Sequence, residues 1–288
     1  MANVAFIGLG VMGFPMAGHL TKAHKVTVYN RNAARAEAWV AKYGNARAPT
    51  PAAASKDAEV VFVCVGDDPD LRQVITGKDG VLEGIRKGSV IVDHTTASAN
   101  IARELHALCK EKGVGFVDGP LSGGQAGAEN GQVTVMCGGD PADYAKAEPV
   151  IASYAKMCKL IGGSGAGQLT KMVNQICIAG LVQGLAEAMN FGKRAGLDME
   201  AVLAVISKGA AQSWQMENRG KNMLAGKFDY GFATDWMRKD LRITMDEARR
   251  NGARLPAIAL IDQFYAEVQA QGHGRWDTSS LMSLLTDN

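Results

Sequence analysis

The first half of the chain alternates short, largely apolar runs with longer stretches of mixed polarity. The apolar runs, which we expect to be strands, are Val4–Ile7, Val26–Tyr29, Val60–Val65, Val90–Val92, Gly115–Val117 and Val133–Cys137. Runs that are apolar at successive positions suit parallel strands buried on both faces. The clearest candidates for crossover helices between them are Pro15–Lys22, Ala33–Lys42 and Ile101–Lys112. This alternation predicts an α/β fold with a doubly wound parallel sheet.

After about Ile161 the pattern changes, and from Gly167 onward no run predicts a strand. Helical spacing of apolar residues predicts one long helix over Gly167–Ala195, followed by Gly196, which suits a left-handed cap. The further helices predicted are Met199–Ser207, Lys239–Asn251 and Ile258–Gln271. A glycine-rich stretch at residues 162–165 marks the expected boundary. We therefore expect an α/β domain over residues 1–162 and an all-α domain over residues 163–288.

Composition narrows the class of protein. The 288 residues are 47% hydrophobic and 21% charged, with a formal net charge of +2, which is typical of a globular protein and excludes disorder. The near-neutral charge argues against a nucleic-acid partner. No uninterrupted apolar run reaches the ~18 residues of a membrane span. Because the chain opens directly with its first predicted strand, with no signal or transit segment before it, we expect a cytoplasmic location.

The cysteines and histidines do not predict a metal site or disulfides. The five cysteines are an odd number and contain no C-x-x-C pair, so buried thiols are the simplest interpretation. The five histidines are scattered along the chain. We therefore predict no bound metal.

A glycine-rich loop follows the first predicted strand and precedes a predicted helix. Gly8, Gly10 and Gly13, with Leu9, Val11 and Met12, fit the pattern G-x-G-x-x-G. In this context the pattern predicts a dinucleotide site, because the glycines permit a tight turn and close approach of the pyrophosphate to the helix N-terminus. The alternative is a glycine-rich turn without a ligand.

The end of the second predicted strand bears on the choice of cofactor. NAD-binding proteins usually place a carboxylate there to bind the ribose, whereas this chain has Asn30 and Arg31. The guanidinium of Arg31 could hold a 2′-phosphate, so we predict a preference for NADP(H) over NAD(H). The alternative is that Arg31 stacks on the adenine and that both cofactors are used.

Two polar stretches are candidates for the chemistry. Lys171 lies early in the long predicted helix, and Asn174 and Gln175, three and four residues later, share its face. A partly buried lysine with a lowered pKa could exchange a proton with a carbonyl oxygen, although such a lysine can also simply reach solvent. The loop at residues 118–124 follows a predicted strand and offers a serine hydroxyl and backbone N–H groups to a carboxylate. The alternative is an ordinary turn.

Four stretches in this order resemble the β-hydroxyacid dehydrogenase family. Residues 6–17 resemble its cofactor loop, residues 118–124 its substrate-binding motif, residues 167–175 its catalytic motif, and residues 239–241 its late Lys-Asp-Leu segment. The family includes 3-hydroxyisobutyrate dehydrogenase, tartronate semialdehyde reductase and the glyoxylate/succinic semialdehyde reductases. The resemblance runs the length of the chain and implies a Rossmann cofactor domain followed by an all-α substrate and oligomerisation domain.

The resemblance also implies a role for each matching residue. Lys171 would be the catalytic acid/base, and Asn174 would position the substrate with Gln175. The substrate carboxylate would bind Ser122, Gly123 and Gly124. Thr96 would lie near the nicotinamide, and Lys239 would close over the site with Phe232 packing nearby. The expected cofactor-binding residues are Gly8, Gly10, Val11, Met12, Gly13, Asn30, Arg31, Val65, Thr96, Phe232 and Lys239.

Three features depart from the family's pattern or stay open. Residues 65–69 stand where family members often carry Leu-Pro, which puts the cofactor contacts of that segment in doubt. His94 stands where a smaller or thioether side chain is common, and either touches the cofactor or is a packed or solvated histidine. Trp214 either shapes substrate specificity or belongs to the core.

We therefore expect an NAD(P)-dependent enzyme that interconverts a small β-hydroxy acid and its semialdehyde in the cleft between its domains. Substrates of the 3-hydroxyisobutyrate, glycerate or 4-hydroxybutyrate type all fit. One alternative is an imine reductase on the same scaffold, although the family's lysine is typically replaced in those relatives. Another is a non-catalytic dinucleotide-binding module. The long apolar helix and the methionine-rich second half predict a homodimer or homotetramer.

Overall fold

The structure, a computed structural model, describes residues 1–286 and divides into two compact units, Met1–Lys171 and Met172–Asn288. The division falls inside the long helix α9 (Ala166–Arg194), whereas the glycine-rich stretch had suggested a boundary at residues 162–163. The difference has a physical cause. The backbone N–H groups of Gly165 and Gln168, where α9 begins, donate hydrogen bonds to Asp118, so the first turns of α9 belong to the first unit.

The first unit is built on one nine-stranded sheet, in the order β3-β2-β1-β4-β5-β6-β8-β7, with β9 also paired to β8. Its strands are β1 (Asn3–Ile7), β2 (Lys25–Tyr29), β3 (Ala46–Arg47), β4 (Val60–Val63), β5 (Val90–Asp93), β6 (Gly115–Asp118), β7 (Leu121–Ser122), β8 (Val133–Gly139) and β9 (Ala155–Gly162). The strands from β3 to β6 are parallel. Their order, 3-2-1-4-5-6, is that of the dinucleotide-binding Rossmann fold, and it reverses direction between β1 and β4.

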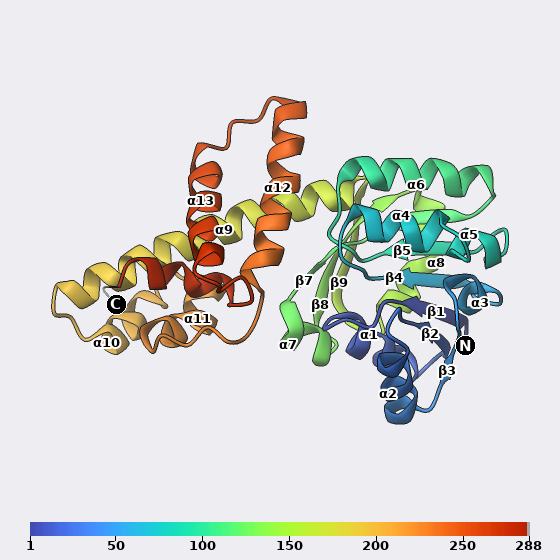
Figure 1. The fold of residues 1–288 in the computed structure, drawn as a ribbon, viewed down its shortest axis with the longest axis horizontal. Coiled ribbons are helices and arrows are strands. Elements are labelled where there is room, and N and C mark those ends of the chain that lie inside the picture. Colours follow the sequence, from blue (N-terminus) through green and yellow to red (C-terminus); the bar gives the residue numbers. More distant parts are fainter. Residues whose placement is uncertain (287–288) are drawn as a thin grey trace. The chain divides into compact units, whose positions relative to one another are not determined.

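Along each central strand, successive side chains pack alternately into two hydrophobic cores, one on each face of the sheet. Phe6 and Phe62 pack with Trp39 on one face, and Ile7 and Val63 pack with Leu105 on the other. The helices on the first face are α1 (Gly13–Leu20), α2 (Ala33–Tyr43) and α8 (Pro141–Ile151), and those on the second are α3 (Pro51–Ser55), α4 (Asp68–Thr76), α5 (Val81–Gly84) and α6 (Ala99–Glu111). Figure 1 shows α4, α5 and α6 on one side of the strands and α1 and α2 on the other. The predicted doubly wound fold is confirmed.

The apolar runs had suggested a sheet that is parallel throughout, but the sheet is mixed. β8 is antiparallel to β6 because the chain returns through β7 and the short helix α7 (Gly124–Glu129) instead of a full crossover helix. β9 was not predicted as a strand. Its residues are half-buried or exposed and none is fully buried, and its two lysines interrupt the apolar pattern that marked the other strands.

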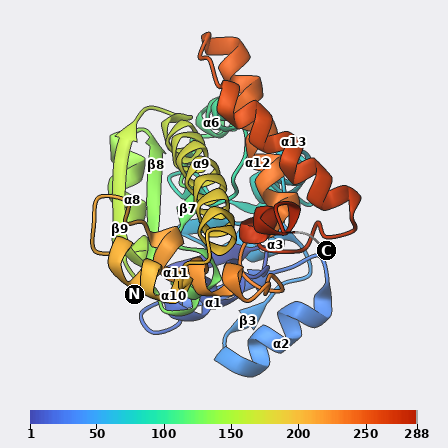
Figure 2. The ribbon, with the colours of Figure 1, turned by 90° about the vertical axis from the view of Figure 1, so that its left-hand side faces the viewer.

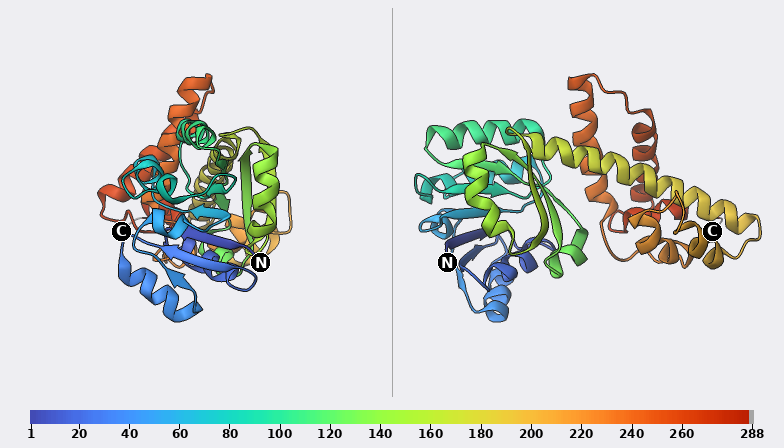
Figure 3. Two further views of the ribbon diagram at one scale, coloured as in Figure 1. Left: turned by 90° about the vertical axis from the view of Figure 1, so that its right-hand side faces the viewer. Right: turned by 180° about the vertical axis from the view of Figure 1, so that it is seen from behind.

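The second unit is helical throughout its described part, apart from one isolated β-bridge. It contains most of α9 together with α10 (Met199–Ile206), α11 (Trp214–Leu224), α12 (Thr234–Asn251), α13 (Pro256–Ala270) and the 3-10 helix η1 (Thr278–Leu284). One hydrophobic core joins these helices, and Leu185, Leu241 and Tyr265 are among its buried members. Figures 1 and 2 show α10 and α11 alongside the C-terminal end of α9, and Figure 3 shows α12 and α13 as an antiparallel pair.

Helix α9 bears on the expectation that no apolar run is long enough to span a membrane. By length and composition alone it could cross a membrane, because its polar residues are few and spaced along it. In its most apolar stretch, 44% of the residues are buried inside the protein. Ala179, Val182 and Ala186, for example, lie in the core of the second unit. Core helices of globular proteins share this length and composition, so α9 gives little support for a membrane span.

Candidate active site

The glycine-rich loop lies at the carboxyl end of β1, where the order of the strands reverses. Gly8 has φ 99°, and a Cβ there would lie 2.2 Å from the carbonyl oxygen of Cys64; a Cβ on Gly13 would lie 2.0 Å from the carbonyl oxygen of Gly8. These two glycines therefore allow the loop, β4 and α1 to pack closely. A Cβ on Gly10, by contrast, would meet no atom within 4 Å. The open side of Gly10 and the uncapped N-terminus of α1 at Met12 fit a bound pyrophosphate.

Of the residues after β2, Asn30 and Arg35 support the glycine-rich loop, whereas Arg31 is exposed to solvent. The Asn30 side chain accepts a hydrogen bond from Leu9 N at 2.9 Å and donates one to Asn32 O, so it holds the glycine-rich loop. Arg35 also supports the loop through a 2.7 Å bond from its Nε to Leu9 O. The Arg31 side chain is 89% exposed and contacts the Asp70 carboxylate at 3.4 Å. Arg31 is therefore an exposed cation that can turn toward a ligand.

The loops after β4 and β5 are joined to each other and to α9. Val65 N donates a 3.0 Å hydrogen bond to Thr95 Oγ1. The buried Gln168 side chain donates to Thr95 O at 2.7 Å and accepts from Ala97 N at 3.1 Å. The half-buried Thr96 is thus held between two anchored neighbours. Residues 65–69, which depart from the family's pattern, lead from β4 into α4. Asp67 caps the start of this helix.

His94 is packed inside the first unit. Its ring stacks on Phe62 with a centroid distance of 5.4 Å, and its two nitrogens lie 2.5 Å from Gly119 O and 2.6 Å from Tyr154 Oη. Because a carbonyl oxygen can only accept, Nδ1 carries the proton and Nε2 accepts from the tyrosine hydroxyl. Burial lowers the pKa of His94 to about 4. The neutral imidazole therefore links the loops that follow β5 and β6.

The loop after β6 presents backbone to solvent. Ser122 ends β7 and is half-buried, while Gly123 and Gly124 are exposed at the start of α7. Their φ angles are 127° and 60°, which residues with a Cβ rarely adopt. Two successive glycines in such conformations beside a hydroxyl expose N–H and O–H donors that a carboxylate can accept from.

Lys171 lies in the second turn of α9 and is 7% exposed. The helix start is fixed by Asp118, which is fully buried at the end of β6 and accepts from Gly165 N at 2.7 Å and Gln168 N at 3.0 Å. Burial raises the pKa of Asp118 to about 7. Lys171 therefore lies just after a helix start whose backbone is hydrogen-bonded to Asp118 at the end of β6.

In the second unit, four polar residues of α9 and α12 are linked. Asn174 Nδ2 donates to Gln175 Oε1 at 2.8 Å, and Gln175 Nε2 donates to Asp240 Oδ2 at 2.7 Å. Lys239 Nζ lies 3.0 Å from Asp240 Oδ1, and both side chains are largely buried. Both ends of the Gln175 amide are used inside the unit, so its contribution is to hold Asn174. The structure thus brings together the predicted residues Asn174, Gln175 and Lys239.

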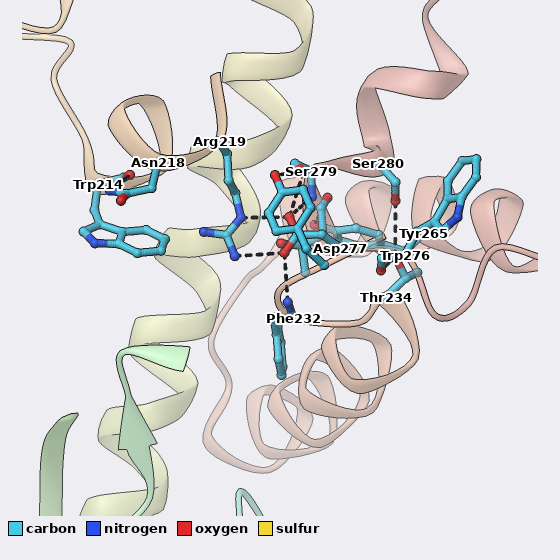
Figure 4. A network of polar contacts seen from close by, with 12 residues as sticks. Trp214, Asn218, Arg219, Phe232, Thr234, Tyr265, Trp276, Asp277, Ser279 and Ser280 are labelled. Carbon is cyan, nitrogen blue, oxygen red and sulfur yellow. Dashed lines mark hydrogen bonds and ion pairs between the residues drawn. The ribbon is translucent and has the colours of Figure 1, made fainter. Parts of the chain in front are cut away.

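Phe232 is held by a buried ion pair, shown in Figure 4. Arg219 donates to both Asp277 oxygens, at 2.8 and 2.9 Å, and Phe232 N donates to the same carboxylate at 2.8 Å. The guanidinium lies over the ring of Trp214, which is 53% exposed. Trp214 is therefore a surface side chain of this unit and not part of its core.

Sequence reasoning gave no role to Gln168 or Asp240, although both stand inside motifs that were singled out. Gln168 precedes Lys171 by one helical turn, which is a usable signal. The partner of Asp240, Gln175, lies on another helix, 65 residues earlier, which no local pattern reveals. Among the described residues, no three His, Cys, Asp or Glu side chains gather as a metal-binding group.

Comparison with known proteins accounts for both units. Residues 3–163 match the family model described as the NAD binding domain of 6-phosphogluconate dehydrogenase. Residues 165–285 match the model described as the NAD-binding domain of NADP-dependent 3-hydroxyisobutyrate dehydrogenase.

Individual relatives align over nearly the whole chain. An uncharacterized oxidoreductase of Shewanella frigidimarina is 62% identical, covering 99% of this chain and 98% of that protein. The 2-hydroxy-3-oxopropionate reductase of Escherichia coli is 31% identical, covering 98% and 97%. The structure of Mycobacterium tuberculosis 3-hydroxyisobutyrate dehydrogenase with L-serine has a TM-score of 0.90 at 29% identity, covering all of both chains. The sheet order, the glycine-rich loop and these full-length matches agree, and the chain belongs to the β-hydroxyacid dehydrogenase family of NAD(P)-dependent oxidoreductases.

Proposed function

We propose that the protein interconverts a small semialdehyde acid and its β-hydroxy acid with NADP(H), and that Lys171 is the general acid/base. The observation that carries the proposal is the burial of Lys171 on a turn of α9 that is anchored next to the cofactor loops. A lysine kept largely out of water at a fixed position can exchange a proton with a substrate oxygen.

The nicotinamide supplies or accepts the hydride when it is bound. During reduction Lys171 Nζ gives a proton to the carbonyl oxygen, and during oxidation it takes the proton from the hydroxyl. Asn174 orients the same oxygen, and Gln175 holds Asn174 through their 2.8 Å hydrogen bond. Because Gln175 is in turn bonded to Asp240, the amide pair has little freedom to turn.

The substrate carboxylate binds the loop of Ser122, Gly123 and Gly124. A substrate of three or four carbons has few groups by which it can be held, so anchoring its far end is needed to align the reacting carbon. The exposed backbone and positive φ angles of the two glycines support this role. The mycobacterial relative was determined with L-serine, which also carries a carboxylate and a β-hydroxyl group.

Arg31 favours NADP(H). The position after β2 lacks a carboxylate that would repel a 2′-phosphate, and the Arg31 side chain is 89% exposed. Its contact with Asp70 at 3.4 Å is long and lies at the surface, so exchanging it for a phosphate costs little. The description of the second family model as NADP-dependent agrees with this preference.

Initial rates with purified protein test the proposed function. NADPH and NADH would each be paired with glyoxylate, succinic semialdehyde, tartronate semialdehyde and methylmalonate semialdehyde, and the matching hydroxy acids would be oxidised in reverse. We expect turnover with at least one pair and faster turnover with NADPH. Tight NADPH binding without any turnover would instead favour an imine-type substrate or a non-catalytic module.

We also propose that α9 packs against a second copy of the chain in a homodimer or homotetramer. Val173, Leu181 and Phe191 are 60%, 47% and 73% exposed, and they follow one face of the helix. Gly180 and Gly184 lie on that face and would allow close approach. Light scattering should give a mass of at least twice 30.4 kDa, and a monomer would refute the assembly.

A cytoplasmic location follows from the same account. The apolar residues of α9 are used in the core of the second unit and on the proposed subunit face, which leaves no need for a lipid partner. Fractionation of cells should recover the protein with the soluble enzymes, and recovery with membranes would contradict this.

A further inference from the structure

The start of α9 is capped by a residue that lies far away in the sequence. The first N–H groups of a helix have no partner within the helix. Here Gly165 N donates to Asp118 Oδ1 and Gln168 N donates to Asp118 Oδ2, so each carboxylate oxygen serves one of them. Asp118 therefore fixes both the position and the direction of the helix start.

The contact between this helix start and the sheet is tight. A Cβ on Gly167 would lie 2.4 Å from the carbonyl oxygens of Asp118 and Met136. A Cβ on Gly138 would lie 2.7 Å from the backbone nitrogens of Ala166 and Gly167. No side chain separates α9 from the ends of β6 and β8 at this point, so the helix start has no room to shift toward the sheet.

Gln168 extends this constraint to the loop after β5. Its side chain is 1% exposed, and its amide donates to Thr95 O and accepts from Ala97 N, which lie on either side of Thr96. Thr95 is itself bonded to Val65 N in the loop after β4. Lys171 follows Gln168 by three residues and so projects from the same side of α9 one turn later.

We propose that Asp118 and Gln168 are positioning residues, which hold the turn that carries Lys171 in register with the loop around Thr96. The inference rests on the proposed function, because it assigns these residues a purpose through Lys171. Asp118 sets the helix start, and Gln168 sets its rotation relative to the cofactor loop. Neither residue needs to touch the substrate. Their effect is on the distance between Lys171 Nζ, which donates the proton, and the carbonyl oxygen that accepts it while the carbon receives the hydride.

The test compares two glutamines of the same helix. Gln168→Met keeps the length of the side chain but removes both hydrogen bonds to residues 95–97. Gln183→Met is the matched control, since Gln183 is also buried in α9 and its amide donates to Glu187 on the same helix. Each variant would be measured for kcat, KM, the Kd of NADPH and the isotope effect on kcat with NADPH deuterated at the transferred position.

We expect Gln168→Met to lower kcat by roughly tenfold to a hundredfold, because small misplacement of reacting groups has effects of this size. The Kd of NADPH should stay within about twofold and the isotope effect should rise, since hydride transfer becomes slower than the other steps. A merely less stable protein would lose active molecules while its isotope effect stayed unchanged. Gln183→Met should match the wild type throughout.

Unchanged kcat and isotope effect in Gln168→Met would overturn the inference. If that variant does not fold, Gln168→Glu replaces it. Glu keeps the acceptor for Ala97 N, and it exchanges the donor to Thr95 O for a carboxylate oxygen that this carbonyl repels; the same changes in kcat and isotope effect are expected. Lys171→Ala separates the two proposals. Full activity in Lys171→Ala would contradict the proposed function, whereas loss of activity there with a normal Gln168→Met would contradict only the positioning role.

Discussion

Gln175 on α9 and Asp240 on α12 are joined by a 2.7 Å hydrogen bond inside the helical unit. Both side chains are almost fully buried, at 1% and 3% exposure. Gln175 also accepts from Asn174, and Asp240 also lies 3.0 Å from the Lys239 ammonium. Two motifs that are 65 residues apart in sequence thus form one polar network.

Asp240→Asn should weaken this network. The amide can still accept from Gln175, but the Lys239 ammonium loses its buried anionic partner. We expect the free energy of unfolding to fall by about 1.5–3 kcal/mol, the range for hydrogen bonds to charged groups. Urea unfolding would measure the change, and kcat/KM should fall with it.

Asp246→Asn provides the control for this prediction. Asp246 lies on the same helix, but its side chain is 57% exposed and pairs with two arginines at the surface. Such pairs contribute little to stability. If Asp240→Asn and Asp246→Asn both unfold at the wild-type urea concentration, the buried network has no stabilising role.

Arg31→Asp should shift cofactor preference toward NAD(H). The change removes the proposed partner of the 2′-phosphate and adds a repulsive carboxylate. We expect the ratio of kcat/KM for NADPH over NADH to fall by about tenfold or more, which corresponds to one charged hydrogen bond. Asp70→Asn should change the same ratio by less than about twofold, because its 3.4 Å contact with Arg31 is long and exposed. An unchanged ratio in Arg31→Asp would exclude Arg31 from cofactor choice.

His94 should make the protein less stable in mild acid. The folded state keeps His94 neutral down to about pH 4, whereas the unfolded chain takes up a proton below about pH 6.5. Stability contributed by neutral His94 is therefore present above pH 6.5 and is lost as the pH falls toward 4, by up to about 3 kcal/mol. His94→Met should lack this loss.

The pH dependence of the wild type alone does not isolate His94, because two buried carboxyl groups also titrate. The comparison with His94→Met is therefore needed. Burial raises the pKa of Asp93 to about 8 and that of Asp118 to about 7. Both groups hold a proton in the folded state that the unfolded chain releases, so they lower stability as the pH rises from about 4. Urea unfolding of wild type and His94→Met over pH 4 to 8 isolates the histidine. Parallel curves for the two proteins would contradict its assignment as a buried neutral group.

The local pattern of apolar residues and glycines was sufficient to predict most of the fold. Strands such as β4 are apolar at every position because both faces of the sheet are covered, and this marked them in the sequence. The predicted long helix, Gly167–Ala195, differs from α9 by one residue at each end. The glycine-rich loop was visible because its context, between a strand and a helix, is itself local.

The elements that were missed depend on distant partners. α11 (Trp214–Leu224) is rich in polar residues, and its buried Arg219 is accommodated because Asp277, 58 residues later, accepts hydrogen bonds from its Nε and one of its Nη atoms. Likewise, the N-terminal cap of α9 comes from Asp118, 47 residues before its nearer partner. A helical or alternating pattern records which face of an element is buried, but it does not record which polar group will meet another across the fold.

The most direct test of the account is the turnover of Lys171→Ala beside the wild type, using the best substrate and cofactor from the initial-rate screen. Loss of the proton donor should lower kcat by about 10²–10⁴-fold, while the Kd of NADPH measured by fluorescence stays near the wild-type value. That result would place the proton transfer at Lys171. A variant that binds NADPH normally and turns over at the wild-type rate would contradict the proposed mechanism.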